Sequence, residues 1–63
     1  MNYLIAKNDK QLGTSLKLLY TEKEAYKVEV VMNEKKKIEF HIVVEADEAR
    51  FNELKTKYEA LIK

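Results

Sequence analysis

The chain has 63 residues, with twelve basic and eleven acidic side chains and no cysteine, proline or tryptophan. A chain of this length forms one domain, residues 1–63, and buries only about 60 % of the surface that its unfolded form exposes. Its near-neutral charge excludes a strong overall field for nucleic acid or an anionic membrane. The absence of cysteine excludes disulfides and a thiolate metal site, and no signal peptide or membrane-spanning stretch is visible. We therefore expect a cytoplasmic protein, and the small core favours a homo-oligomer.

The first predicted strand is residues 1–7, a short apolar run with aromatic and β-branched members. Asn8 and Gln11 follow with the spacing of a capping box, which predicts a helix from about residue 9. Its apolar positions recur at helical spacing, and these are Leu12, Leu16, Leu19 and Tyr20. Gly13 lies inside this helix, where it costs about 1 kcal/mol relative to alanine.

The end of this helix is predicted near residues 20–22, because Lys23 would otherwise fall on the apolar stripe. Thr21 and Glu24 have the spacing of another capping box. One extra helical turn before the next strand is therefore an open alternative.

Residues 26–45 show the clearest strand pattern. Apolar side chains occupy the even positions, namely Tyr26, Val28, Val30, Met32, Ile38, Phe40, Ile42 and Val44. Most odd positions are polar, so the two runs on either side of residues 33–36 predict a β-hairpin with one buried and one solvated face. We expect Met32 to lie opposite Ile38 and Glu29 opposite His41. The turn contains no glycine, so a loop longer than two residues is expected.

The last predicted helix spans residues 46–63, with Asp47 as its N-cap. Apolar residues recur along it at helical spacing, at Phe51, Leu54, Tyr58, Leu61 and Ile62.

The element order β-α-β-β-α predicts an α+β domain with a three-stranded, mostly antiparallel sheet and both helices on its even face. Residues 42–44 are apolar on both faces, which favours a central position for the last strand and the strand order 2-3-1. This topology resembles a ferredoxin-like unit without its final strand. The order is also close to that of a KH domain, but the Gly-x-x-Gly clamp of that fold is absent.

His41 is the only histidine, and Glu29 or Glu39 on the same sheet face is its nearest expected partner. An ordinary cross-strand pair accounts for this better than a catalytic base does. Acidic residues gather at Glu45, Asp47 and Glu48, where the helix N-terminus already favours negative charge. Residues 13–15 hold one glycine beside two hydroxyls, too few glycines for a phosphate loop. We therefore expect no enzyme, no cofactor, no metal and no small-molecule substrate.

The predicted function is a non-catalytic protein-interaction module that forms a homodimer through the uncovered, odd face of the sheet. The residues expected at that interface are Leu4, Val31, His41 and Val43. The alternative is a nucleic-acid-binding accessory protein that uses the hairpin tip, with contacts from Lys35, Lys36 and Lys37. A third possibility is a partner-binding protein that offers a sheet edge for strand addition.

Overall fold

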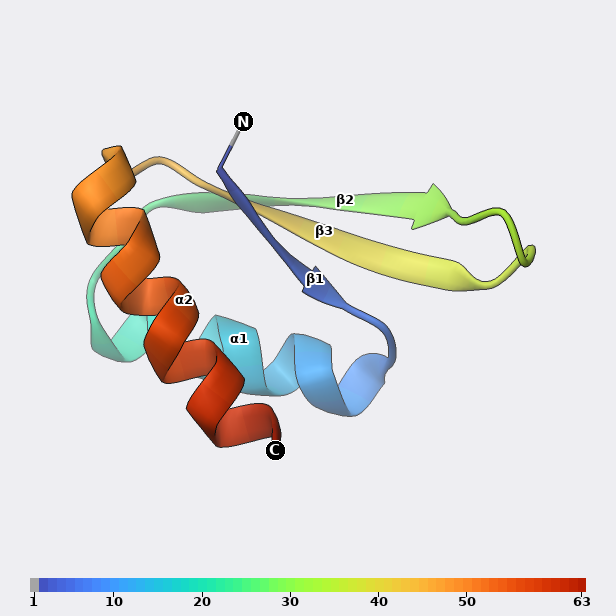
Figure 1. The fold of residues 1–63 in the computed structure, drawn as a ribbon, viewed down its shortest axis with the longest axis horizontal. Helices are drawn as coiled ribbons and strands as arrows, with labels where there is room; N and C mark the ends of the chain where they lie inside the picture. Colours follow the sequence, from blue (N-terminus) through green and yellow to red (C-terminus); the bar gives the residue numbers. More distant parts are fainter. Residues whose placement is uncertain (1) are drawn as a thin grey trace.

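A computed structural model describes residues 2–63, so the first residue of the predicted strand 1–7 lies outside it. In chain order the elements are β1 (Tyr3–Ala6), α1 (Asp9–Thr21), β2 (Tyr26–Met32), β3 (Ile38–Val44) and α2 (Glu48–Ile62). This is the predicted order β-α-β-β-α, and the fold is of the α+β class (Figure 1).

The sheet has the strand order β1-β3-β2, which is the predicted order read from the other edge, and both strand pairs are antiparallel. The central strand is β3, as its run of apolar residues on both faces predicted. Met32 lies opposite Ile38 and Glu29 opposite His41, so the predicted hairpin register is confirmed.

The predicted N-caps hold both helices at their starts. The Asn8 side chain accepts a hydrogen bond from the Gln11 N–H at 2.9 Å, and Gln11 Oε1 accepts one from the Lys7 N–H at 2.8 Å. At α2 the Asp47 side chain accepts from the Arg50 N–H at 2.8 Å. Each cap satisfies a backbone donor that has no partner inside the helix.

The helix α1 ends at Thr21, within the predicted interval, and no extra turn follows. Lys23 takes a left-handed conformation with φ 57°. The Glu24 N–H donates to the Leu19 carbonyl at 3.0 Å, which closes the last turn. This left-handed residue turns the chain toward β2, so the capping-box alternative at Thr21 is not realised.

The hairpin turn is a three-residue loop, Glu34–Lys36, in which Lys36 is left-handed with φ 58°. The Asn33 side-chain oxygen accepts hydrogen bonds from the Lys35 and Lys37 N–H groups at 2.9 and 3.0 Å. The expectation of a loop longer than two residues is confirmed, and an asparagine side chain organises it.

Both helices cover one face of the sheet, and a single core lies between them. It is formed by Leu4, Ala6, Ile42 and Val44 of the sheet with Leu18, Leu19, Phe51, Leu54 and Tyr58 of the helices. Ser15 is buried beside them, and its hydroxyl donates to the Leu12 carbonyl at 2.7 Å.

The placement of Leu4 on the uncovered face was wrong. Leu4 pairs with Ile42, and residues directly opposite each other in an antiparallel pair point to the same face. Leu4 is therefore buried in the core, while Tyr3 and Ile5 point to the uncovered face.

Two predicted core residues of the helices are also exposed, Tyr20 of α1 and Leu61 of α2. In α1 the buried residues are Ser15, Leu18 and Leu19. The helix packs against α2 as well as the sheet, so its buried surface is turned away from the stripe that apolar spacing alone suggested.

The expectation that the whole even face of the hairpin lies under the helices was wrong. The helices cover β3 from its middle to its end, where Ile42 and Val44 are buried and Phe40 is half-buried against the core, whereas every even residue of β2 is exposed. Figure 1 shows β2 and β3 extending beyond β1 and both helices. Because β1 has four residues against seven in each hairpin strand, the helices pack over β1 and the adjacent half of β3.

Candidate functional site: the hairpin surface and its free edge

Most of the exposed large apolar side chains of residues 2–63 lie on the even side of the hairpin. We call it the apolar hairpin face, and its residues are Tyr26, Val28, Val30, Met32 and Ile38. Val30 is 66 % exposed, Met32 65 % and Ile38 53 %. Every even position of the two strands carries an apolar side chain, so no charge interrupts this side of the hairpin.

The strand that carries most of this face, β2, is also an edge strand. The Asn33 N–H donates to the Lys37 carbonyl and the Glu45 N–H to the Ala25 carbonyl, both at 3.0 Å. In an antiparallel ladder such bonded pairs recur at every second residue. The odd residues of β2 therefore direct their backbone groups toward β3, and the even residues direct theirs outward.

The opposite edge of the sheet differs, because a helix side chain covers part of β1. The Tyr58 hydroxyl donates to the Ile5 carbonyl at 3.1 Å. Tyr58 is buried, and burial raises the pKa of its hydroxyl. Its bond occupies one of the few outward-facing acceptors of this short strand, whereas no residue of 2–63 bonds to the outer edge of β2.

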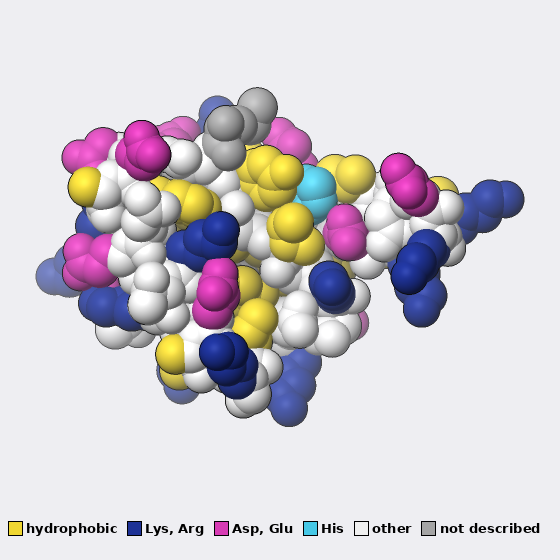
Figure 2. All heavy atoms as spheres, in the orientation of Figure 1, with side chains coloured by type: hydrophobic (Ala, Val, Ile, Leu, Met, Phe, Trp, Pro, Cys, Tyr) yellow, Lys and Arg dark blue, Asp and Glu magenta, His cyan; other side chains and the backbone are white. Residues whose placement is uncertain are grey.

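The uncovered, odd face carries the sequence-predicted residues other than Leu4. Val31, His41 and Val43 are half-buried there, and the Tyr3 ring stacks on the His41 ring with centroids 4.8 Å apart. His41 Nε2 lies 3.3 Å from Glu39 Oε1. Hydrogen bonds from Asn33 and then His41 lower the pKa of the Glu39 carboxyl. Figure 2 shows the histidine between hydrophobic and acidic side chains.

His41 thus has a carboxylate and an aromatic ring as neighbours. Its expected alternative partner, Glu29, lies opposite it in the sheet, yet the hydrogen bond goes to Glu39. Among residues 2–63 no group of three or more His, Asp or Glu side chains is placed to hold a metal ion. The geometry is that of a histidine and a carboxylate paired on the open face of the sheet.

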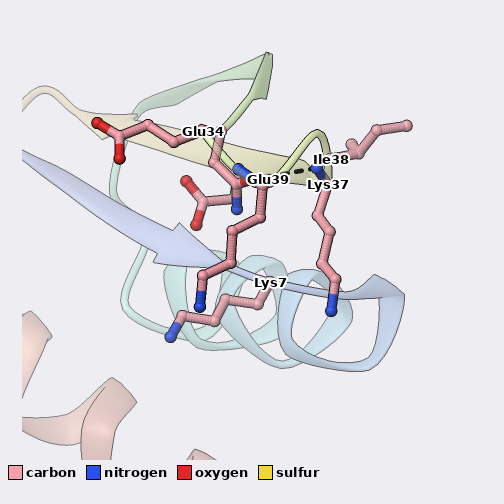
Figure 3. Close-up of a pocket in the computed structure, with 7 residues that line it drawn as sticks. Lys7, Glu34, Lys37, Ile38 and Glu39 are labelled. Carbon is pink, nitrogen blue, oxygen red and sulfur yellow. Dashed lines mark hydrogen bonds between the residues drawn. The ribbon is translucent and has the colours of Figure 1, made fainter.

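The predicted lysine cluster lies at the exposed tip of the hairpin, where Figure 2 also shows acidic side chains. A hollow beside the tip is lined by Lys7, Asn33, Glu34, Lys35, Lys37, Ile38 and Glu39. Figure 3 shows Lys7 and Lys37 extending on the same side of this hollow, while Glu34 points away. No sequence pattern indicated that Lys7, which follows β1, would line the hollow beside the tip.

A second charged cluster joins the two helices at the other end of the molecule. Arg50 Nε lies 2.8 Å from Glu24 Oε1, and its other nitrogens lie 3.5 Å from Glu22 and 3.1 Å from Glu53. Lys57 pairs with Glu22 as well. These contacts lower the pKa of the Glu22 carboxyl, chiefly through the Lys57 hydrogen bond. Each of the three carboxylates contacts Arg50 or Lys57, so the cluster links the chain after α1 to α2.

Of the three acidic residues near the start of α2, two have contacts with named partners, and Glu48 lies in the first turn of the helix. Asp47 caps the helix, and Glu45 lies 3.9 Å from Lys27.

Neither helix within the described residues is long and apolar enough to cross a membrane.

Comparison with protein-family models, curated proteins and solved structures finds no match.

Proposed function

We propose that this protein is a small non-catalytic interaction module that forms a homodimer through the apolar hairpin face. The exposure of Val30, Met32 and Ile38 carries the proposal. Single exposed apolar residues are common on any protein, but a contiguous apolar patch is typical of an interaction surface.

The size of the chain supports self-association. At about 0.05–0.15 kcal/mol per residue, 63 residues give a free energy of unfolding of about 3–9 kcal/mol. Burial of apolar surface contributes about 25 cal/mol per Å², so covering the apolar hairpin face stabilises a chain with a small core. The odd face is the weaker candidate, because Lys27, Glu29 and Glu39 lie among its apolar residues.

A non-catalytic role accords with the local chemistry. His41 contacts Glu39 and Tyr3, and among residues 2–63 no hydroxyl nucleophile is hydrogen-bonded to it. A general base requires a group that orients it and a reacting group within hydrogen-bond reach. The Glu39 carboxylate could orient His41, but the second requirement is not met by a side chain of residues 2–63.

Sedimentation equilibrium from micromolar to millimolar protein tests the homodimer. We expect a reversible dimer that the double substitution Val30→Ser and Ile38→Ser weakens. The matched control is Val31→Ser with Val43→Ser, which removes two apolar side chains from the opposite face. Circular dichroism establishes that each variant is folded. A monomer at all concentrations refutes the homodimer, and weakening by the control pair alone moves the interface to the odd face.

Nucleic-acid binding through the lysine tip is the second candidate, and the position of Lys7 beside the tip favours it. Fluorescence anisotropy with labelled single- and double-stranded oligonucleotides at low salt tests it. Binding that falls steeply with salt, and that Lys35→Glu with Lys37→Glu abolishes, would support this candidate. Lys55→Glu on α2, combined with Lys63→Glu just after the end of that helix, is the control for charge alone. No binding at low salt excludes it.

A further inference from the structure

The free edge of β2 carries a charge pattern that is complementary to itself. Lys27 and Glu29 are consecutive odd residues on the open face, and Glu29 has no ion-pair partner within residues 2–63. Within the described residues Lys27 forms one ion pair, with Glu45 at 3.9 Å, and both of these side chains are largely exposed. The backbone groups on the outer side of the strand belong to the even residues between and around them.

Two copies of β2 can pair edge to edge only through these outward even residues, and a two-fold axis makes the pairing antiparallel. The position of the axis decides which charges meet. An axis at Glu29 sets that residue opposite itself, and an axis at Lys27 does the same for the lysine. An axis at Val30 sets Glu29 opposite Val31. An axis at Val28 sets Lys27 of each copy opposite Glu29 of the other.

We propose that β2 pairs with β2 of a second copy of this chain about a two-fold axis at Val28, which joins the two sheets into one of six strands. This inference rests on the proposed function and specifies how the homodimer forms. Opposite charges that face each other across strands are favourable and like charges are unfavourable. The charge pattern therefore selects this register from those that keep most of β2 paired.

The same register suits the apolar side. It sets Val28 opposite Val28 of the second copy and Tyr26 opposite Val30, on the face where these residues are exposed. Aromatic and β-branched residues are favourable cross-strand partners. The two apolar hairpin faces then adjoin across the axis, and each outward N–H and C=O of the paired residues gains a partner.

Charge reversal tests the register. Lys27→Glu and Glu29→Lys each set like charges opposite one another at both symmetric positions, so each is expected to weaken the dimer about tenfold at low salt, about 1.4 kcal/mol. The double variant exchanges the two charges, and we expect wild-type affinity from it. An equimolar mixture of the two single variants should form the heterodimer. Lys55→Glu on α2 is the control for net charge.

Proline substitution tests whether the backbone edge is used. The Val28 N–H points outward, so Val28→Pro leaves the pairing of β2 with β3 intact and removes a donor from the free edge. We expect a folded monomer from it, and a retained dimer from Val28→Thr, which keeps that donor.

The two sets of variants separate this inference from the proposed function. A dimer that persists in Val28→Pro but is lost in the Val30→Ser, Ile38→Ser variant retains the proposed function and overturns edge pairing. Failure of the charge-exchanged double variant to recover affinity overturns the register at Val28. A wild-type protein that is monomeric at every concentration overturns both.

Discussion

Two isoleucines of β3 test how far the helices cover the sheet. Ile42 and Ile38 occupy the same face of the same strand, yet Ile42 is fully buried and Ile38 is 53 % exposed. Removing three carbons from Ile42 forfeits about 2.4 kcal/mol of transfer free energy and leaves a cavity, so Ile42→Ala is expected to cost about 2–5 kcal/mol. Half of that transfer term is absent at Ile38, and no closed cavity forms there. Ile38→Ala is therefore expected to cost about 1 kcal/mol.

Urea unfolding followed by circular dichroism measures both costs, at a concentration where sedimentation shows a monomer. A slope of about 1 kcal/mol per molar urea converts the two losses into midpoint shifts of about 2 M or more and about 1 M. Both variants lose the same strand propensity on changing isoleucine to alanine. The difference between their two losses in free energy of unfolding therefore measures how far the helices cover each position. Equal losses for the two variants in the monomer would refute the conclusion that the far half of the hairpin is uncovered.

Four further predictions concern the monomer. Gly13→Ala should raise the free energy of unfolding by about 1 kcal/mol, since a methyl group there meets no atom within 4 Å. Lys23→Gly should raise the free energy of unfolding by about 0.5–1 kcal/mol, because glycine adopts the left-handed conformation without strain. Thermal unfolding measures both changes. Tyr58→Phe should cost about 0.5–1.5 kcal/mol and speed hydrogen exchange of β1, because the Ile5 carbonyl loses its donor. The pKa of Glu22 is lower in the folded protein than its ordinary value of 4.5, so its contribution to stability is present above pH 4.5 and is lost as the pH falls through the folded pKa. Glu22→Gln should accordingly flatten the fall in stability below about pH 4.5, measured by urea unfolding at each pH, and an unchanged profile would contradict this.

Local signals predicted the elements and the sheet well. Side-chain alternation located the hairpin and its register, and the capping residues Asn8 and Asp47 located both helix starts. Each of these signals depends on neighbours within a few residues. The run at Ile42–Val44 also identified the central strand, because a strand with neighbours on both sides is apolar on both faces.

The extent to which the helices cover the sheet could not be predicted in the same way. Alternation shows that Val30 and Ile42 share a face, but how far the helices extend over that face depends on the length of β1 and on the packing of α1 against α2. Leu4 was misplaced for a related reason, because its face is decided by a pairing with Ile42 that spans most of the chain. Tyr20 was misplaced because the contact with α2 rotates the buried side of α1.

Most of the apolar hairpin face and the free edge of the sheet belong to the same strand, β2, and this links folding to association. β2 is held by β3 alone, so within the monomer its pairing is secured on one side and its even side chains lie in water. A second copy at that edge supplies the outer backbone bonds, and it sets Val28 beside Val28 and Tyr26 beside Val30, which removes part of their apolar surface from water. A dimer binds the folded chain and not the unfolded one, so its formation raises apparent stability with protein concentration. The melting temperature of the wild-type protein should therefore rise with concentration, whereas that of Val28→Pro should stay constant.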